Sequence, residues 1–206
     1  MSIFKSAALL AGGKSSRMGF NKQMFHVAGE RLFETFLPTL TKRFDDVMIV
    51  TTQPEIYEGM GVRAISDIIP GYGPLSGIHA AISEAECEYV YIIACDMPEI
   101  NLAYIDYMVG KLTASPADAC ITKKGDWIEP FHGFYSKRAL PAIESDLLAG
   151  IGTIYQPLQK INTLYISEME ARRFTPDWSL FHNLNTLEEY KSSIKNLIQI
   201  GEVMNP

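Results

Sequence analysis

The sequence predicts a mostly parallel, doubly wound α/β sheet in a single domain. Apolar runs of strand length alternate along the chain with segments of helical periodicity, which is typical of parallel sheets covered by helices. The run from Tyr89 to Ala94, YVYIIA, has no polar face, as expected of a strand that is buried on both sides. The 206 residues, 47% of them hydrophobic, suffice for one buried core. No repeat or linker divides the chain, so we expect residues 1–206 to form one domain.

Seven apolar runs, several rich in β-branched or aromatic residues, are expected to form the strands of this sheet. In chain order they cover residues 3–10, 47–51, 62–66, 89–94, 117–122, 131–135 and 164–166. Helical spacing of apolar residues between these runs predicts helices near residues 32–44, 75–85, 102–112, 139–149 and 154–161. Pro38, in the middle of the first helical pattern, predicts a kink or a break there. Thr186 and Glu189 have the spacing of a capping box and predict the start of a last helix.

The net charge and the cysteines indicate which binding partners are disfavoured and which cellular compartment suits the protein. The formal net charge of −6 disfavours binding to nucleic-acid backbones and to anionic membranes, because both attract basic surfaces. Cys87, Cys95 and Cys120 fit neither a disulfide framework nor a zinc site, and a reducing cytoplasm suits them. The apolar stretch 7–11 is too short to span a membrane and lacks the order of a signal peptide. We therefore expect a cytoplasmic protein that binds neither nucleic acid nor membrane.

The loop after the first strand, LAGGKSSRMGFNK at residues 10–22, combines three glycines with three cations. Glycine backbone can approach a ligand closely, and turned amides in such a loop form an anion-binding nest. No acidic residue precedes Glu30. A P-loop is excluded because Ala8 stands where that motif needs glycine, and the dinucleotide fingerprint is absent. The pattern indicates a loop that binds the triphosphate of a nucleotide; the structural alternative is a glycine-rich turn with solvated lysines.

Two aspartates follow two of the expected strands, where ligands of doubly wound sheets bind. Asp67 begins the loop DIIPGYGPLSG, in which Pro74 suits a helix start; alternatively Asp67 caps a turn. Asp96 follows the buried run at 89–94 within ACDMP, where a carboxylate is costly unless it is paired or binds a metal ion. Magnesium is commonly held by one or two carboxylates together with substrate phosphates. Asp96 is therefore a candidate Mg²⁺ ligand; the alternative is a turn aspartate before Pro98.

The second half of the chain carries polar residues suited to an acceptor. Glu129 and Pro130 precede an aromatic strand, and Asn183 and Asn185 alternate in FHNLNT so that both amides point the same way from an extended segment. Two amides side by side suit a hydrogen-bonding ligand such as a pterin or a phosphate; alternatively they form the entry to a helix. The four histidines lack metal-ligand spacing, so we expect structural roles for them. They are His26, His79, His132 and His182.

The four ordered elements LAGGKSSRMGFNK, DIIPGYGPLSG, ACDMP and NLNT resemble the signature of the molybdenum cofactor guanylyltransferases. These belong to the wider superfamily of MobA-like and sugar-nucleotide transferases. The resemblance covers about residues 7–190 and implies a three-layer α/β/α fold of the nucleotide-diphospho-sugar transferase type. It implies transfer of GMP from GTP to molybdenum-molybdopterin with release of pyrophosphate, assisted by Mg²⁺. Cofactor-carrier proteins or recipient molybdoenzymes are further candidate partners.

The resemblance also implies roles for individual residues. Nucleotide binding is implied for Leu10, Ala11, Gly12, Gly13, Lys22, Thr51, Asp67, Gly73, Pro74, Leu75 and Asp96. Catalysis is implied for Arg17, Lys22 and Asp96, with Asp96 as the metal ligand, and acceptor binding for Glu129, Pro130, Asn183 and Asn185. The family often has Asp before its essential lysine, whereas this chain has Asn21, which removes one charge.

Two other functions compete with this interpretation. Cytidylyltransferases that act on molybdopterin, sugar-phosphate or isoprenoid acceptors share the fold and the early motif. The molybdopterin cytidylyltransferases tend to have L-A-A-G where this chain has LAGG, so the resemblance favours guanine, while the residues alone leave the base open. A non-catalytic nucleotide-binding adaptor is the third candidate, and the joint presence of Lys22 and Asp96 argues against it.

Overall fold

The computed structural model describes residues 3–11, 26–27, 30–97, 99–184 and 189. Within them the main sheet has seven strands in the order β5-β4-β1-β6-β8-β7-β9. The strands are β1 (Ser6–Leu10), β4 (Asp46–Val50), β5 (Arg63–Ile65), β6 (Tyr89–Ala94), β7 (Ala119–Lys124), β8 (Trp127–Ser136) and β9 (Thr163–Ser167). Every strand run that the sequence predicts forms a strand, with ends shifted by a few residues. The predicted mostly parallel sheet is confirmed.

The antiparallel strand β8, inserted between β6 and β7, is the feature that the sequence analysis missed. Only Gly125 and Asp126 connect β7 to β8. A connection of two residues permits a hairpin and nothing else, because parallel neighbours need a crossover of about a dozen residues. Gly125 has a φ of 58°, which suits the primed turns of two-residue hairpins.

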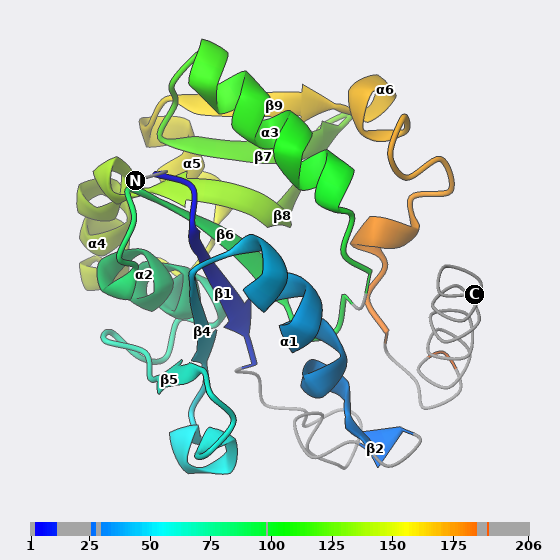
Figure 1. Ribbon diagram of the computed structural model, residues 1–206. Helices are drawn as coiled ribbons and strands as arrows, with labels where there is room; N and C mark the ends of the chain where they lie inside the picture. Colours follow the sequence, from blue (N-terminus) through cyan, green and yellow to red (C-terminus); the bar gives the residue numbers. More distant parts are fainter. Residues whose placement is uncertain (1–2, 12–25, 28–29, 98, 185–188, 190–206) are drawn as a thin grey trace, which may run out of the picture.

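Helices cover both faces of the sheet (Figure 1). They are α1 (Leu32–Arg43), α2 (Pro74–Glu84), α3 (Leu102–Ala114), α4 (Leu140–Leu148), α5 (Tyr155–Lys160) and α6 (Glu168–Ala171). Short 3-10 turns are η2 (Pro54–Tyr57), η3 (Lys137–Ala139) and η4 (Ser179–Phe181), and β2 (His26–Val27) pairs with β3 (Glu30–Arg31) as a separate hairpin. Helix α1 runs through Pro38, so the expected alternative of a break there is wrong. The helix expected from Thr186 lies outside the described residues apart from Glu189.

Two apolar clusters, one on each face of the sheet, confirm the three-layer architecture. Alternate residues of β1 enter different clusters, Leu9 into one and Leu10 into the other, because strand side chains alternate between faces. Helices α1 and α3 pack against the first cluster, and α2, α4 and α5 against the second. None of the helices within the described residues has the length and hydropathy needed to cross a bilayer.

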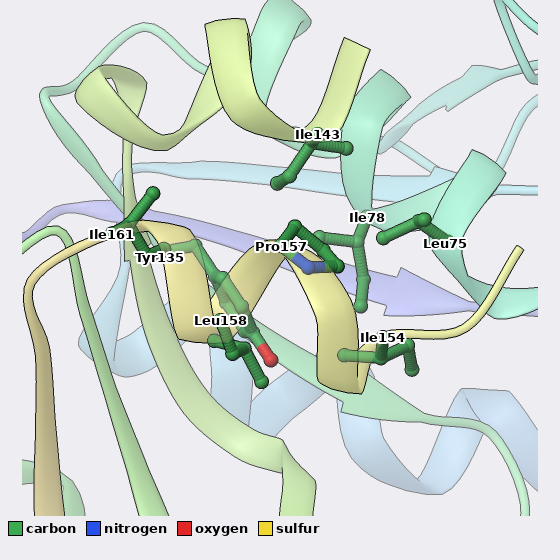
Figure 2. Close-up of a pocket in the computed structure, with 8 residues that line it drawn as sticks. All are labelled: Leu75, Ile78, Tyr135, Ile143, Ile154, Pro157, Leu158 and Ile161. Carbon is green, nitrogen blue, oxygen red and sulfur yellow. The ribbon is translucent and has the colours of Figure 1, made fainter. Parts of the chain in front are cut away.

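A small apolar pocket lies in the second cluster, where α2, α4 and α5 meet over β8 (Figure 2). It leaves no room for a water molecule and is lined by Leu75, Ile78, Tyr135, Ile143, Ile154, Pro157, Leu158 and Ile161. The one hydroxyl among these side chains, that of Tyr135, donates a hydrogen bond to the Pro130 carbonyl at 2.7 Å. The lining therefore offers packing and no polar group for catalysis or specific binding.

Glu170 at the start of α6 joins three elements through hydrogen bonds. Ser167 donates to it from its hydroxyl at 2.6 Å and from its backbone at 2.9 Å, which completes a capping box. Tyr107 and Lys111 of α3 donate to its other oxygen at 2.7 and 3.0 Å. These bonds, first that from the Ser167 hydroxyl and then that from Tyr107, lower the pKa of Glu170 from 4.5 to about 2.

Replacing this carboxylate is expected to make stability less dependent on acid pH. A pKa that is lower in the folded state stabilises the fold above the unfolded value of 4.5, and the contribution disappears as the pH falls towards 2. Glu170→Gln should cost about 1 kcal/mol at pH 7, a value kept modest by solvent screening. Urea unfolding at pH 7, 4 and 2.5 should show that the difference in unfolding free energy between wild type and Glu170→Gln becomes smaller as the pH falls. Glu58→Gln, which changes an exposed carboxylate, is the control. A difference in unfolding free energy between wild type and Glu170→Gln that stays constant with pH would contradict the explanation.

Candidate functional site

The carboxyl ends of four parallel strands meet at one edge of the sheet. β1 pairs with β4 and β6, and β4 pairs with β5. Backbone hydrogen bonds continue past the strand ends. The Ala11 amide donates to Val50 at 2.8 Å, the Cys95 amide to Leu10 at 3.0 Å, and the Thr51 amide to Ile65 at 2.9 Å. The residues that follow β1, β4, β5 and β6 therefore lie in a row, where ligands of doubly wound sheets bind.

The first loop is described only at its start. Leu10 and Ala11 are buried at the end of β1. The other residues implied for the triphosphate site lie outside the described residues, and their roles stay predictions. They are Gly12, Gly13, Arg17 and Lys22.

Asp67 and the start of α2 lie against the end of β1. A Cβ atom at Gly77 would lie 3.3 Å from Leu10 Cδ1 and 3.8 Å from Asp67 Oδ1, so the absence of a side chain there permits this close approach. Gly73, the N-cap of α2, has φ 59° and ψ −138°, a conformation that favours glycine. Pro74 occupies the first turn of α2, as predicted. Burial raises the pKa of Asp67, and the nearby His79 partly offsets the effect.

Two residues implied for nucleotide binding have side chains engaged elsewhere. Leu75 is buried and lines the apolar pocket of Figure 2. The Thr51 hydroxyl accepts a hydrogen bond from the Gln53 amide at 3.1 Å. A nucleotide contact from Leu75 would therefore come through its backbone.

Asp96 connects two sequence elements that lie far apart in the chain. It is half-buried just after β6, in a turn closed by the Met97 amide bonding to Ala94 at 3.1 Å. The Leu184 amide donates to the Asp96 carbonyl at 2.8 Å, which brings the exposed Asn183 beside the ACDMP element. Asn185 lies outside the described residues. The sequence did not indicate that these two elements lie close together, and the structure shows it as far as Asn183.

The metal-ligating side chains of the described residues are sparse. They contain no group of three or more His, Cys, Asp and Glu that could hold a metal ion by themselves. Magnesium commonly takes one or two carboxylates and fills its other positions with substrate phosphates and water. The single carboxylate of Asp96 at the ligand edge of the sheet fits that mode and does not fit a structural zinc site.

Glu129 lies half-buried on β8, and Trp178 Nε1 donates to its Oε1 at 3.3 Å. Burial raises the pKa of this carboxyl above its usual 4.5, while the hydrogen bond from Trp178 acts in the opposite direction. The neighbouring Pro130 carbonyl accepts the Tyr135 hydroxyl.

Trp178 and Ser179 were missed by sequence reasoning. Trp178 has a φ of 68°, which is unusual for a bulky residue and costs energy unless the surroundings hold it. The Ser179 hydroxyl donates to Glu99 Oε2 at 2.7 Å, so this segment contacts both the loop after β6 and Glu129. The rarity of tryptophan, with two in the chain, was the signal available.

Two of the histidines are buried, in agreement with structural roles. His132 shares a hydrogen bond of 2.8 Å between its Nδ1 and the Tyr91 hydroxyl, and burial lowers its pKa to about 3. His79 is buried in α2, with Glu144 Oε1 3.4 Å from its Nε2. His132 is therefore neutral at physiological pH.

Comparison with known proteins gives consistent results. The family model of the MobA-like NTP transferase domain matches residues 7–161. A probable molybdenum cofactor guanylyltransferase of Peptoclostridium acidaminophilum is 50% identical over 194 residues, 92% of this chain and 88% of that protein. The molybdenum cofactor guanylyltransferase of Syntrophotalea carbinolica is 48% identical, over 91% of this chain and 90% of that protein. The crystal structure of molybdopterin-guanine dinucleotide biosynthesis protein A from Archaeoglobus fulgidus superposes with a TM-score of 0.80 at 26% identity, covering 94% of this chain and 99% of that chain.

Proposed function

This chain belongs to the MobA-like NTP transferase family, and we propose that it is a molybdenum cofactor guanylyltransferase. It transfers GMP from GTP to molybdenum-molybdopterin and releases pyrophosphate. An oxygen of the acceptor's terminal phosphate forms a bond to the α-phosphorus, and the bond from that phosphorus to the leaving pyrophosphate breaks. The single observation that carries the proposal is the row of Ala11, Thr51, Asp67 and Asp96 along one edge of the sheet.

The N-terminal half of the chain binds the nucleotide in this proposal. The backbone of Leu10, Ala11, Gly12 and Gly13 contacts the nucleotide, and Arg17 and Lys22 neutralise charge on the triphosphate. Asp67, Thr51 and the turn Gly73-Pro74-Leu75 complete the nucleotide side, with Gly73 held in a conformation that favours glycine. Phosphoryl transfer depends mainly on positioning and electrostatic stabilisation, so cations and backbone amides suffice without a covalent catalyst.

Asp96 holds the catalytic Mg²⁺ in this proposal. The ion would neutralise charge on the transferred phosphate and on the leaving pyrophosphate. Support comes from the position of Asp96 after a central buried strand, at the edge where the triphosphate binds.

The C-terminal half binds the acceptor through Glu129, Pro130, Asn183 and Asn185. The hydrogen bond between Leu184 and Asp96 supports this division, because it holds Asn183 beside the proposed metal ligand. We further propose a cytoplasmic location, since the number and spacing of the three cysteines, Cys87, Cys95 and Cys120, fit neither a disulfide framework nor a zinc site. Carrier proteins or recipient molybdoenzymes would be the protein partners.

Titration with the four NTPs tests the proposal. GTP is expected to bind at least about 10-fold tighter than CTP, UTP or ATP in calorimetry, a difference of about 1.4 kcal/mol, and Mg²⁺ should strengthen the binding. Release of pyrophosphate on adding molybdenum-molybdopterin would establish catalysis and exclude a non-catalytic adaptor. A preference for CTP would move the protein to the cytidylyltransferases, and binding without turnover would refute the enzymatic role.

A further inference from the structure

The two tryptophans of this chain both lie near one carboxylate, that of Glu129. Trp178 Nε1 donates a hydrogen bond to Glu129 Oε1 at 3.3 Å. Trp127 and Glu129 are two residues apart on β8, so their side chains share a face of the strand. One indole N–H thus orients a half-buried carboxylate, and a second indole lies on the same face of the strand.

The two indoles differ in how firmly they are held. Trp178 is 7% exposed, with the Lys124 ammonium 5.0 Å and the Arg172 guanidinium 5.3 Å from its ring centroid. Phe181 packs against the same ring, with centroids 4.7 Å apart. Trp127 is 68% exposed at the start of β8. One indole is therefore a fixed donor, and the other presents an open aromatic face to solvent.

Glu129 retains the capacity to accept further hydrogen bonds. A carboxylate has about four lone-pair positions, and the Trp178 indole uses one of them. Among the described residues no Lys or Arg nitrogen forms an ion pair with it; Lys124, the nearby cation, pairs with Glu168 at 3.8 Å. Partial burial without an ion pair weakens the fold rather than supporting it, which favours a role in binding.

The position of this carboxylate relates it to the acceptor side of the site. Trp178 begins a short segment that ends at Leu184. In this segment the Ser179 hydroxyl donates a hydrogen bond to Glu99, and the Leu184 amide donates one to the Asp96 carbonyl. Glu129 and the proposed metal ligand Asp96 therefore contact the same segment, residues 178–184.

We propose that Glu129 recognises the paired N–H donors of a 2-amino-4-oxopyrimidine ring, that of the acceptor's pterin, while Trp127 stacks on the ring face. This inference rests on the proposed function. A carboxylate matches two adjacent N–H donors in a bidentate geometry, and indole faces stack well on planar rings. Guanine presents the same donor edge, so the experiment must separate the two rings. The pterin is favoured because Glu129 lies on β8, beyond β6 from the loop expected to hold the nucleotide.

The test compares pterin with lumazine, which has a carbonyl oxygen in place of the 2-amino group. Fluorescence titration of the wild type should show pterin binding about 10-fold tighter or more, because the lumazine oxygen would face the carboxylate. Glu129→Gln should remove most of this preference. Trp127→Ala should weaken both ligands about fivefold, and Trp127→Phe should weaken them less, because stacking remains. Glu58→Gln, beside the edge strand β5, should change neither affinity.

The same samples, checked for intact melting curves, are titrated with GTP and with ITP, which lacks the 2-amino group. Loss of the GTP-over-ITP preference in Glu129→Gln would assign the carboxylate to guanine and overturn the inference. Equal wild-type affinity for pterin and lumazine, absence of pterin binding, or a preference for pterin that survives both Glu129→Gln and Trp127→Ala would also overturn it.

Failure of this inference is distinguishable from failure of the proposed function. If the wild type still binds GTP selectively, the proposed guanylyltransferase function stands. Loss of GTP selectivity in the wild type would contradict that function.

Discussion

Asp96→Asn is expected to lower the rate of guanylyl transfer by about 10²-fold or more. Asparagine presents one neutral oxygen where the aspartate presents a carboxylate, and Mg²⁺ binds charged oxygen ligands more strongly. The loss should appear in the rate of pyrophosphate release at saturating GTP and molybdenum-molybdopterin. Raising the Mg²⁺ concentration should recover part of the activity, since a weakened site fills at higher concentration.

The fold should survive this substitution. The hydrogen bond between Leu184 and residue 96 uses the backbone carbonyl, which asparagine retains. Asp45→Asn makes the same change at an exposed carboxylate that is distant from Asp96 in the sequence. This matched control should keep full activity. Wild-type turnover of Asp96→Asn in Mg²⁺ would show that Asp96 does not hold the ion.

Lys160→Met is expected to reduce the free energy of unfolding by about 3 kcal/mol, the largest stability effect that we anticipate. Lys160 of α5 forms an ion pair with Asp146 of α4, whose side chain is 1% exposed. Asp146 Oδ2 is buried without a hydrogen-bond partner among the described atoms. Removing the ammonium would therefore leave a buried carboxylate without its counterion, and urea unfolding at pH 7 measures the cost.

A second lysine offers a matched control. Lys5 pairs with Asp45 at 3.4 Å, and that carboxylate is 76% exposed, so Lys5→Met should cost no more than about 1 kcal/mol. Adding Asp146→Asn to Lys160→Met should restore part of the lost stability, because the charge is then gone. A double variant no more stable than Lys160→Met alone would exclude the buried charge as the cause.

Local sequence carried enough information for most of the fold. The strand at Tyr89–Ala94 was predicted at its observed bounds, because a run without a polar face is stable only when both faces are covered. Helix α2 begins at Pro74, one residue before the predicted start, in agreement with the role expected for this proline. The order of glycines, cations and carboxylates after successive strands was also sufficient to identify the family.

Tertiary structure alone decided how the acceptor side is assembled. The insertion of β8 beside β6 depends on pairing across 40 or more residues, which the local hairpin between β7 and β8 does not specify. The hydrogen bonds from Trp178 to Glu129 and from Leu184 to Asp96 join residues 49 and 88 positions apart. The sequence by itself indicated the residues that we propose to bind phosphate, metal ion and acceptor. Only the folded chain brings Glu129 and its two indoles together, because their proximity follows from strand pairing and packing.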